Sequence, residues 1–277
     1  MQARVMGPEI LARTMGQPTA RGSSPRAWQY HSRSDRHSKV ACWTLLFDLL
    51  ARCDILRQAA ANGKVGFDIN HVMVGPINKT LDLVVTWNPV DRSSSRGFAD
   101  LVGDYGIVLL AEEDHLLKTL PLLPKVRAED MPEIAIALEA KACMTEHVKS
   151  LPRLHAEILA TGYLAKRAAR KCISVSYSLV NAATTFVTPS HDQPNSHDQP
   201  SDARKVVEMI GSAVPTSGDG NDYGYDAVGI TVIDCRNDGS PVRVVDNPSI
   251  GPGRLDHTHY ERMLVNLCAL FRARFAG

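Results

Sequence analysis

Apolar residues along this chain follow a helical period in some stretches and an extended period in others, and the two alternate. In residues 41–63 the apolar side chains recur three and four positions apart and Gly63 closes the stretch, which predicts an amphipathic helix. Its apolar face comprises Cys42, Leu45, Leu46, Leu49, Leu50 and Cys53. Residues 64–87 hold two apolar, β-branched runs on either side of GPINK, which predicts two strands joined by a turn.

The next part of the chain repeats this change of period. EIAIALEAKA, residues 133–142, is a predicted buried strand because it is almost continuously apolar. Residues 150–171 predict a helix with Ser150 as its N-cap and Pro152 in its first turn. Residues 171–187 then predict one long strand or two short ones.

Further elements complete the predicted order. Residues 104–125 predict a strand or short helix and then a second helical piece, and helices are expected at 203–214 and 256–275. Residues 227–245 predict a β-hairpin with an Asp-Gly turn. The arginines of the last helix, Arg262, Arg272 and Arg274, are expected to face solvent. This order predicts an α/β (α+β) fold with a central mixed β-sheet flanked by helices.

Residues 1–40 differ from the rest of the chain. They contain seven Arg or Lys residues but only two acids, Glu9 and Asp35, in a segment rich in Gly, Pro and Ser. This composition predicts a basic, weakly ordered arm that either contacts phosphates or serves as a solvated tail or dimer strap. Residues 41–277 are expected to form a single domain, with a core at 41–187 and a C-terminal hairpin and helix at 201–277.

Composition narrows the functional classes. Hydrophobic residues make up 44% and charged residues 22% of the 277 residues, with a formal net charge of +1. No apolar run approaches the ~18 residues of a membrane helix, so no membrane partner is expected. Any nucleic-acid contact must come from local basic patches. The six cysteines are scattered without a C-x-x-C pair, which favours reduced thiols in a cytoplasmic protein.

Two opposite charges at the end of the 133–142 strand are the candidate chemistry. Glu139 and Lys141 share a face of that strand because side chains alternate with period two. If Asp82 lies on the neighbouring strand, two carboxylates and the backbone carbonyl of Ala140 offer the hard oxygen ligands that Mg²⁺ prefers. Lys141 would orient or help deprotonate the attacking water and offset charge on a phosphate. These groups suffice for phosphodiester hydrolysis.

The Asp of TLDLVV and the E-x-K of LEAKA resemble the motif of the PD-(D/E)xK nuclease superfamily, to which most type II restriction endonucleases belong. The order of elements over residues 41–187 is also similar: helix, hairpin with the acid, strand ending in E-x-K, helix, strand. The resemblance implies a restriction-endonuclease-like core and a Mg²⁺-dependent endodeoxyribonuclease that cleaves double-stranded DNA at a specific sequence, as a type II restriction enzyme does. It also implies a homodimer, which suits a palindromic site. Asp82, Glu139 and Lys141 would be the catalytic residues.

Two features depart from the family pattern. Glu139 follows Asp82 by 57 residues, a longer gap than usual, and Leu81 precedes the Asp where the motif name has Pro. The long gap leaves Asp104 as an alternative first acid and Asp68 as a weaker one.

Basic residues near these elements are candidate DNA contacts. Lys149 and Arg153 fall near the start of the helix that follows E-x-K, and Arg92 and Arg96 fall in a polar insertion. Each of them also suits capping or a solvated surface. The Gly-rich loop 217–225 is a further candidate for groove contacts.

Other interpretations stay open. Glu139 and Lys141 could be an exposed ion pair, which contributes only ~0–1 kcal/mol and carries no function. The chain could be a repair or structure-specific nuclease of the same fold, or a non-catalytic DNA-binding protein. A zinc hydrolase would use His257, His259 or the loop that contains HDQP twice.

Overall fold

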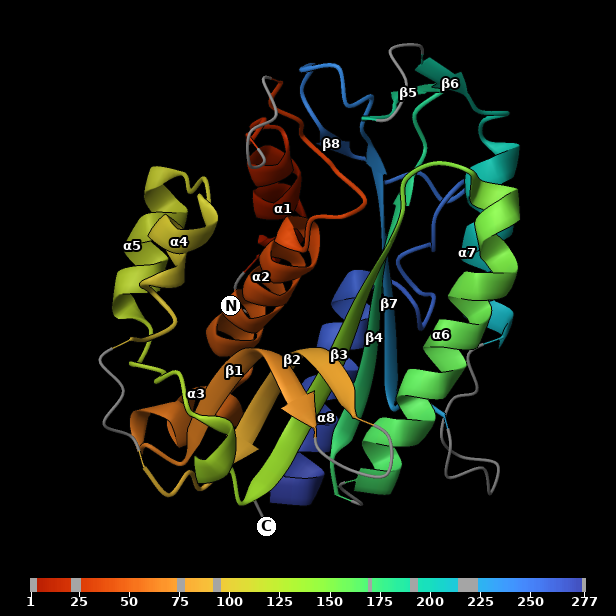
Figure 1. Ribbon diagram of the computed structural model, residues 1–277. Helices are drawn as coiled ribbons and strands as arrows, with labels where there is room; N and C mark the ends of the chain where they lie inside the picture. Colours follow the sequence, from red (N-terminus) through yellow and green to blue (C-terminus); the bar gives the residue numbers. More distant parts are fainter. Residues whose placement is uncertain are drawn as a thin grey trace.

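A six-stranded mixed sheet lies at the centre of the protein (Figure 1). The computed structural model describes residues 4–20, 26–73, 78–91, 96–168, 171–189, 194–213 and 224–275. The strands of the sheet, in spatial order, are β1 (Val65–Met73), β2 (Lys79–Trp87), β3 (Glu133–Cys143), β4 (Ile173–Asn181), β7 (Ala227–Asp234) and β8 (Arg243–Val244). The predicted α/β fold with a central mixed sheet is therefore confirmed.

The direction of the strands changes across the sheet. β1, β2 and β3 form an antiparallel meander, whereas β3, β4 and β7 run parallel and β8 returns antiparallel to β7. Parallel neighbours need a crossover connection, and α6 (His147–Ala168) provides it between β3 and β4. Between β4 and β7 the chain forms a separate two-stranded sheet, β5 (Thr185–Val187) and β6 (Pro194–Ser196), and then α7 (Ser201–Ala213).

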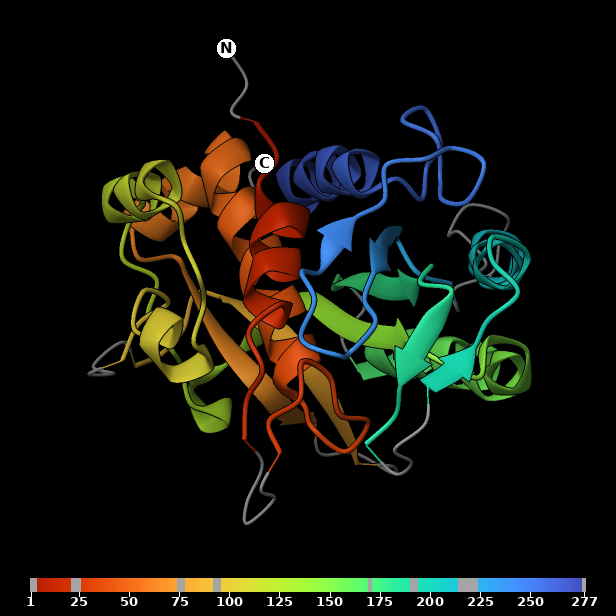
Figure 2. The same ribbon diagram turned by 90° about the horizontal axis from the view of Figure 1, so that it is seen from above.

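Helices cover both faces of the sheet, so its central strands are buried on both sides. All nine residues of β4 are buried. On one face, α6 and α7 form an apolar cluster with β4 and β7 that includes Leu154, Ile158 and Val180. On the other face lie α2 (Arg36–Arg52) and α8 (Tyr260–Phe275), which share the main core. Seen from above, α8 and α6 lie on opposite sides of the sheet (Figure 2).

The prediction of a weakly ordered N-terminal arm is wrong for residues 7–15. These residues form α1 (Gly7–Met15), which packs against α2 and buries Ile10, Leu11 and Met15. The buried carboxylate of Asp48, on α2, accepts hydrogen bonds from the backbone amides of Met6 and Gly7 at 3.0 and 2.7 Å. The helical spacing of the apolar residues in this short helix is hard to recognise in the sequence, because the surrounding segment 1–40 is rich in Gly, Pro and Arg.

Several predicted helix boundaries also change. The expected helix at 41–63 is two helices, α2 and α3 (Asp54–Ala61), because Cys53 between them is extended (φ −97°, ψ 95°). α6 begins at His147, so Ser150 is not its N-cap; its hydroxyl donates to the carbonyl of His147. The uncertain region 104–125 contains the end of α4 (Leu101–Tyr105) and α5 (Ala111–Thr119), and η1 (Ala128–Asp130) follows.

The C-terminal half agrees more closely with the prediction. β7 and β8 form the expected hairpin, whose Gly239 adopts the positive φ (97°) that an Asp-Gly turn favours. α8 buries its predicted apolar face, Tyr260, Leu264, Leu267 and Phe271. Of the helices in the described ranges, none is both long and apolar enough to cross a membrane.

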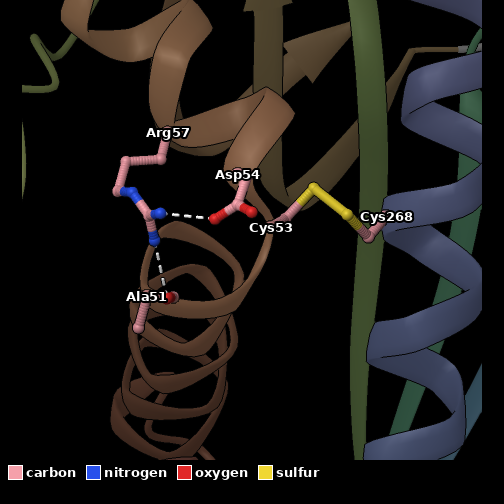
Figure 3. Close-up of a disulfide and its surroundings, with 5 residues drawn as sticks. All are labelled: Ala51, Cys53, Asp54, Arg57 and Cys268. Carbon is pink, nitrogen blue, oxygen red and sulfur yellow. Dashed lines mark hydrogen bonds and ion pairs between the residues drawn. A yellow bond between two sulfur atoms is a disulfide. The ribbon is translucent and has the colours of Figure 1, made fainter. Parts of the chain in front are cut away.

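A disulfide joins Cys53 to Cys268 across 215 residues of sequence (Figure 3). It connects the junction of α2 and α3 to the middle of α8. The prediction that all six cysteines are reduced is therefore wrong for this pair, because sequence spacing alone does not reveal that two distant cysteines meet. The other four cysteines, Cys42, Cys143, Cys172 and Cys235, are free and buried.

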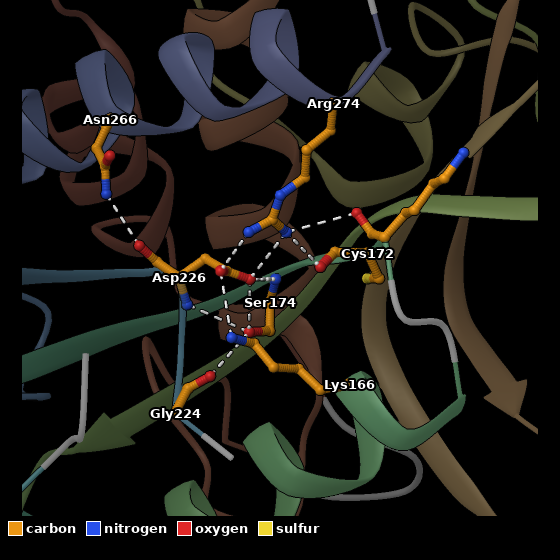
Figure 4. A network of polar contacts seen from close by, with 8 residues as sticks. Lys166, Cys172, Ser174, Gly224, Asp226, Asn266 and Arg274 are labelled. Carbon is orange, nitrogen blue, oxygen red and sulfur yellow. Dashed lines mark hydrogen bonds and ion pairs between the residues drawn. The ribbon is translucent and has the colours of Figure 1, made fainter. Parts of the chain in front are cut away.

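Buried Asp226 binds the C-terminal end of α8 through Arg274 (Figure 4). Its side chain, 1% exposed, contacts Arg274 at 2.7 Å and Lys166 at 3.2 Å, and it accepts the backbone N–H of Ser174 at 2.9 Å. Burial alone would raise the pKa of Asp226, but these partners lower it to about 2. The expectation that Arg274 only faces solvent is thus wrong: it ties α8 to α6, β4 and the start of β7.

We expect the disulfide to contribute about 2–5 kcal/mol to the free energy of unfolding, because the reduced chain regains conformational freedom when it unfolds. The measurement is thermal unfolding of the wild type with and without a reductant, beside the double variant Cys53→Ser/Cys268→Ser. Reductant should lower the Tm of the wild type and leave that of the double variant unchanged. Equal shifts in both proteins would contradict this role.

Candidate active site

Asp82 and Glu139 lie on neighbouring antiparallel strands. Leu83 pairs with Leu138, and the same register continued by one residue places Asp82 opposite Glu139. The backbone N–H of Ala140 donates to Oδ2 of Asp82 at 2.8 Å, which fixes this carboxylate beside β3. The structure therefore brings these two acids close together where β2 and β3 meet.

Glu139 is a buried carboxylate that binds two ammonium groups. It is 4% exposed, and its Oε1 lies 2.6 Å from Nζ of Lys141 and 3.0 Å from Nζ of Lys79. Such burial excludes the reading of Glu139 and Lys141 as an exposed surface pair. Removing a partner from a buried ion pair is strongly destabilising, so the two lysines are also structural necessities for the carboxylate.

Asp82 is poorly compensated by comparison. Burial and the nearby negative charge of Glu139 raise its pKa to about 6, although the N–H of Ala140, the charge of Lys141 and the hydroxyl of Ser38 act in the opposite direction. Two carboxylates at one place disfavour each other's ionised form. Among the described residues both lysine ammonium groups form ion pairs with Glu139 and neither does with Asp82, so Asp82 is the carboxylate that a bound cation would relieve.

Lys141 stays a cation at neutral pH. Burial lowers its pKa, but the carboxylates of Glu139, Glu157 and Asp82 outweigh burial and the net shift is upward. Oε2 of Glu157, on α6, lies 3.3 Å from its Nζ. An ammonium group held in this way suits electrostatic stabilisation and water orientation rather than proton abstraction.

The structure adds residues that the sequence did not reveal. Lys79 stands three positions before Asp82, at the start of β2, and a lysine at the edge of a strand gives no functional signal by itself. Ser176 and Ser178 pair in register with Glu139 and Lys141, and both are buried. Three serines alternate along ISVSYS of β4, and this regular spacing in a buried strand was the signal that could have been read.

Three oxygens around the carboxylate have no hydrogen-bond partner among the described residues: Oε2 of Glu139 and the hydroxyls of Ser176 and Ser178. A buried polar group without a partner costs about 1–3 kcal/mol. Their concentration beside Asp82 and Lys141 indicates a place that is polar and incompletely satisfied in this state of the protein.

The segment assigned to the N-terminal arm also reaches the site. α2 begins at Arg36, and Ser38 in its first turn lowers the pKa of Asp82. Burial, with a contribution from the charge of Lys141, lowers the pKa of His37 to about 4. His37 is therefore neutral at physiological pH, and the first turn of α2 forms one wall of the site.

The alternative acids lie elsewhere. Asp104 is exposed on α4 and forms an ion pair with Arg96. Asp68, on β1, contacts His71 at 3.3 Å and Lys125 at 3.6 Å. Asp82 is the acid whose contacts place it with Glu139, and it is the first acid that we retain.

The candidate DNA contacts have different environments. Lys149 and Arg153 are on the exposed surface of the first turns of α6, where they face Glu146 at 2.6 Å and Glu157 at 3.6 Å. Arg96 pairs with Asp104, as above. Arg92 and most of the Gly-rich loop 217–225 lie outside the described residues. The DNA-binding role of these positions stays a prediction.

The histidines expected for a zinc site do not form a ligand cluster among the described residues. His257 pairs with Asp256 at 3.4 Å, and His197 contacts Thr145 at 3.1 Å and the carbonyl of Ala183 at 2.9 Å. His191 lies outside the described ranges. Within them, no group of three or more His, Cys, Asp or Glu residues is arranged to hold a metal ion. A metal at Asp82 and Glu139 would thus need water and backbone oxygen to complete its ligands.

Comparison with known proteins gives no match: neither a protein-family model, nor a curated protein, nor a solved structure is significantly similar to this chain. The site is therefore interpreted from its own geometry.

We expect Asp82→Asn to stabilise the protein at alkaline pH, because the ionised Asp82 carboxylate is disfavoured by burial and by Glu139. A pKa raised to about 6 means that the stabilising contribution of protonated Asp82 is complete below pH ~4 and is lost as pH rises through 6. The variant should exceed the wild type by on the order of 1–3 kcal/mol at pH 8 and match it near pH 4.

Thermal unfolding between pH 4 and pH 8 without metal measures this difference. Asp114→Asn, at an exposed ion pair with Lys118 on α5, is the matched control and should change stability by no more than a few tenths of a kcal/mol. A wild type that is more stable than Asp82→Asn at pH 8 would contradict the assigned electrostatics.

Proposed function

We propose that this protein is a divalent-metal-dependent phosphodiester hydrolase, and specifically a Mg²⁺-dependent endonuclease that acts on double-stranded DNA. The observation that carries the proposal is the meeting of Asp82, Glu139 and Lys141, on two adjacent strands, in a buried and polar place. Two neighbouring carboxylates disfavour each other's ionised form, whereas a Mg²⁺ site makes use of one or two carboxylates.

The residues fit Mg²⁺ by their chemistry. Mg²⁺ binds one or two carboxylates and keeps several waters, and Asp82 with Glu139 supplies that set. Oε2 of Glu139 is buried without a hydrogen-bond partner among the described residues, and burial together with the charge of Glu139 raises the pKa of Asp82. The backbone carbonyl of Ala140 is the proposed third protein ligand. When bound, the metal would polarise the phosphoryl oxygen and lower the pKa of a bound water.

The other residues of the site hold charge and position. Lys141, protonated through its contact with Glu139, would face the phosphate and offset the negative charge that builds up during hydrolysis. Glu157 holds the same ammonium from the side of α6, and so limits where Lys141 can point. The first turn of α2 brings neutral His37 near Lys141 and the hydroxyl of Ser38 to Asp82.

The surrounding fold supports a restriction-endonuclease-like core. The meander β1-β2-β3 leads through α6 to β4, which is parallel to β3. This is the order of elements that the resemblance to PD-(D/E)xK nucleases implies, with α2 before the meander. Sequence-specific cleavage by a homodimer is the finer part of the proposal, and it rests on that resemblance.

The test is digestion of plasmid and phage DNA by purified protein in Mg²⁺ and in EDTA. We expect cleavage in Mg²⁺ alone, and a loss of at least about 10²-fold in Lys141→Ala, since that variant lacks the charge that stabilises the transition state. Lys118→Ala, at an exposed lysine in an ion pair with Asp114, is the matched control and should cleave like the wild type.

Discrete fragments with common ends would support the restriction-type activity. Cleavage confined to branched or mismatched substrates would favour a repair or structure-specific nuclease of the same fold. DNA binding without cleavage in any divalent metal would overturn the hydrolase and leave a non-catalytic DNA-binding protein.

A further inference from the structure

Two lysines meet at one oxygen atom of Glu139. Nζ of Lys141 lies 2.6 Å and Nζ of Lys79 lies 3.0 Å from the same Oε1. Lys79 comes from the start of β2 and Lys141 from β3, so the carboxylate is held from two strands. Both ammonium groups therefore contact one oxygen atom of Glu139, and within the described residues neither forms an ion pair with Asp82.

The two lysines differ in their other contacts. Lys141 has a second carboxylate, Glu157, at 3.3 Å, and its side chain is 19% exposed. For Lys79, Glu139 is the one ion-pair partner within the described part of the chain, and its side chain is 27% exposed. Lys141 is therefore anchored independently of Glu139, whereas Lys79 depends on Glu139 and lies nearer to solvent.

A divalent cation at Glu139 and Asp82 conflicts with this arrangement. The cation would lie within a few ångströms of both ammonium groups, and like charges at that separation repel strongly in a partly buried place. Mg²⁺ also demands near-ideal octahedral coordination by oxygen, which leaves little freedom for a ligand oxygen that also contacts two ammonium groups. One lysine must move away, and Lys79 is the one with less to hold it.

We propose that Lys79 competes with the metal for Glu139 and, once displaced, binds the substrate phosphodiester. This inference rests on the proposed function, because it takes Asp82 and Glu139 as metal ligands. In the metal-free protein, Lys79 shields a buried carboxylate that would otherwise be undercompensated. In the loaded protein, its ammonium group stays tethered at the start of β2, beside the metal to which the phosphate binds. Lysine is suited to phosphate as a mobile point charge.

A purely structural role for Lys79 predicts the opposite effect on the metal. If Lys79 only stabilised the fold around Glu139, its removal would disorder the carboxylate and weaken metal binding. If Lys79 competes with the metal, its removal leaves Glu139 freer and strengthens metal binding. The sign of the change separates the two roles, and it is measured without turnover.

The experiment titrates Ca²⁺ and Mg²⁺ into wild type, Lys79→Ala, Lys79→Gln and Lys79→Arg, and follows the rise in Tm. We expect the half-saturating metal concentration to fall by about tenfold in the Ala and Gln variants and to stay near the wild-type value in the Arg variant. Binding of a short DNA duplex in Ca²⁺, measured by fluorescence anisotropy, should weaken by about tenfold in the Ala and Gln variants. The salt dependence should lose about one phosphate contact.

Lys118→Ala is the control for the loss of a lysine elsewhere and should match the wild type in both titrations. Suppose the wild type binds metal through Asp82, but Lys79→Ala and Lys79→Gln bind it equally or more weakly. This result would overturn the proposal that Lys79 competes with the metal, and it would leave the proposed function intact. If neither metal changes the Tm of the wild type, so that the wild type behaves like Asp82→Asn, the proposed function and this inference are overturned together. Should Lys79→Ala fail to fold, the Gln and Arg variants carry the comparison.

Discussion

The burial of the Glu139 carboxylate is the constraint on which the site depends. A charge that is 4% exposed must be neutralised within the protein, and here β2 supplies Lys79 while β3 supplies Lys141. These contacts require β2 and β3 to be paired in one register, since a slip of one residue would turn Asp82 away from the face that carries Glu139. The Ala140 N–H bond to Asp82 holds the same register. The neutralisation of Glu139 therefore depends on the same register that pairs β2 with β3.

A second buried carboxylate shows what a purely structural solution looks like. Asp226 is surrounded by Arg274, Lys166 and the backbone of Ser174, and its pKa falls to about 2. Every one of these partners donates or carries positive charge, and together they join α8, α6 and β4 into one unit. Asp82 differs from Asp226, because burial and the charge of a second carboxylate, Glu139, raise its pKa to about 6.

Local patterns predicted those parts of the fold and site whose partners are close in sequence or repeat with a clear period. The hairpin of β1 and β2, the buried strand β3 and the acids Asp82 and Glu139 follow from alternation and from a lone acid in an apolar strand. Lys79 did not, because a lysine at the start of a strand gives no pattern of its own, and only the structure shows its contact with Glu139 across 60 residues of sequence. The same holds for the disulfide between Cys53 and Cys268, which closes 215 residues. α1 was missed because its burial is decided by α2 and Asp48, not by its own composition.

The sign of each pKa shift, taken with its cause, separates these buried acids by role. Asp48 also has a pKa raised to about 6, but burial is the reason, and the amides of Met6 and Gly7 and the hydroxyl of Tyr260 all donate hydrogen bonds to it. It therefore serves as an anchor for the start of α1. Asp82 alone among these three is raised partly by a second carboxylate. Asp82 is kept buried beside a second carboxylate at a cost to the stability of the fold, and this cost is the physical basis on which we propose a metal-dependent reaction there.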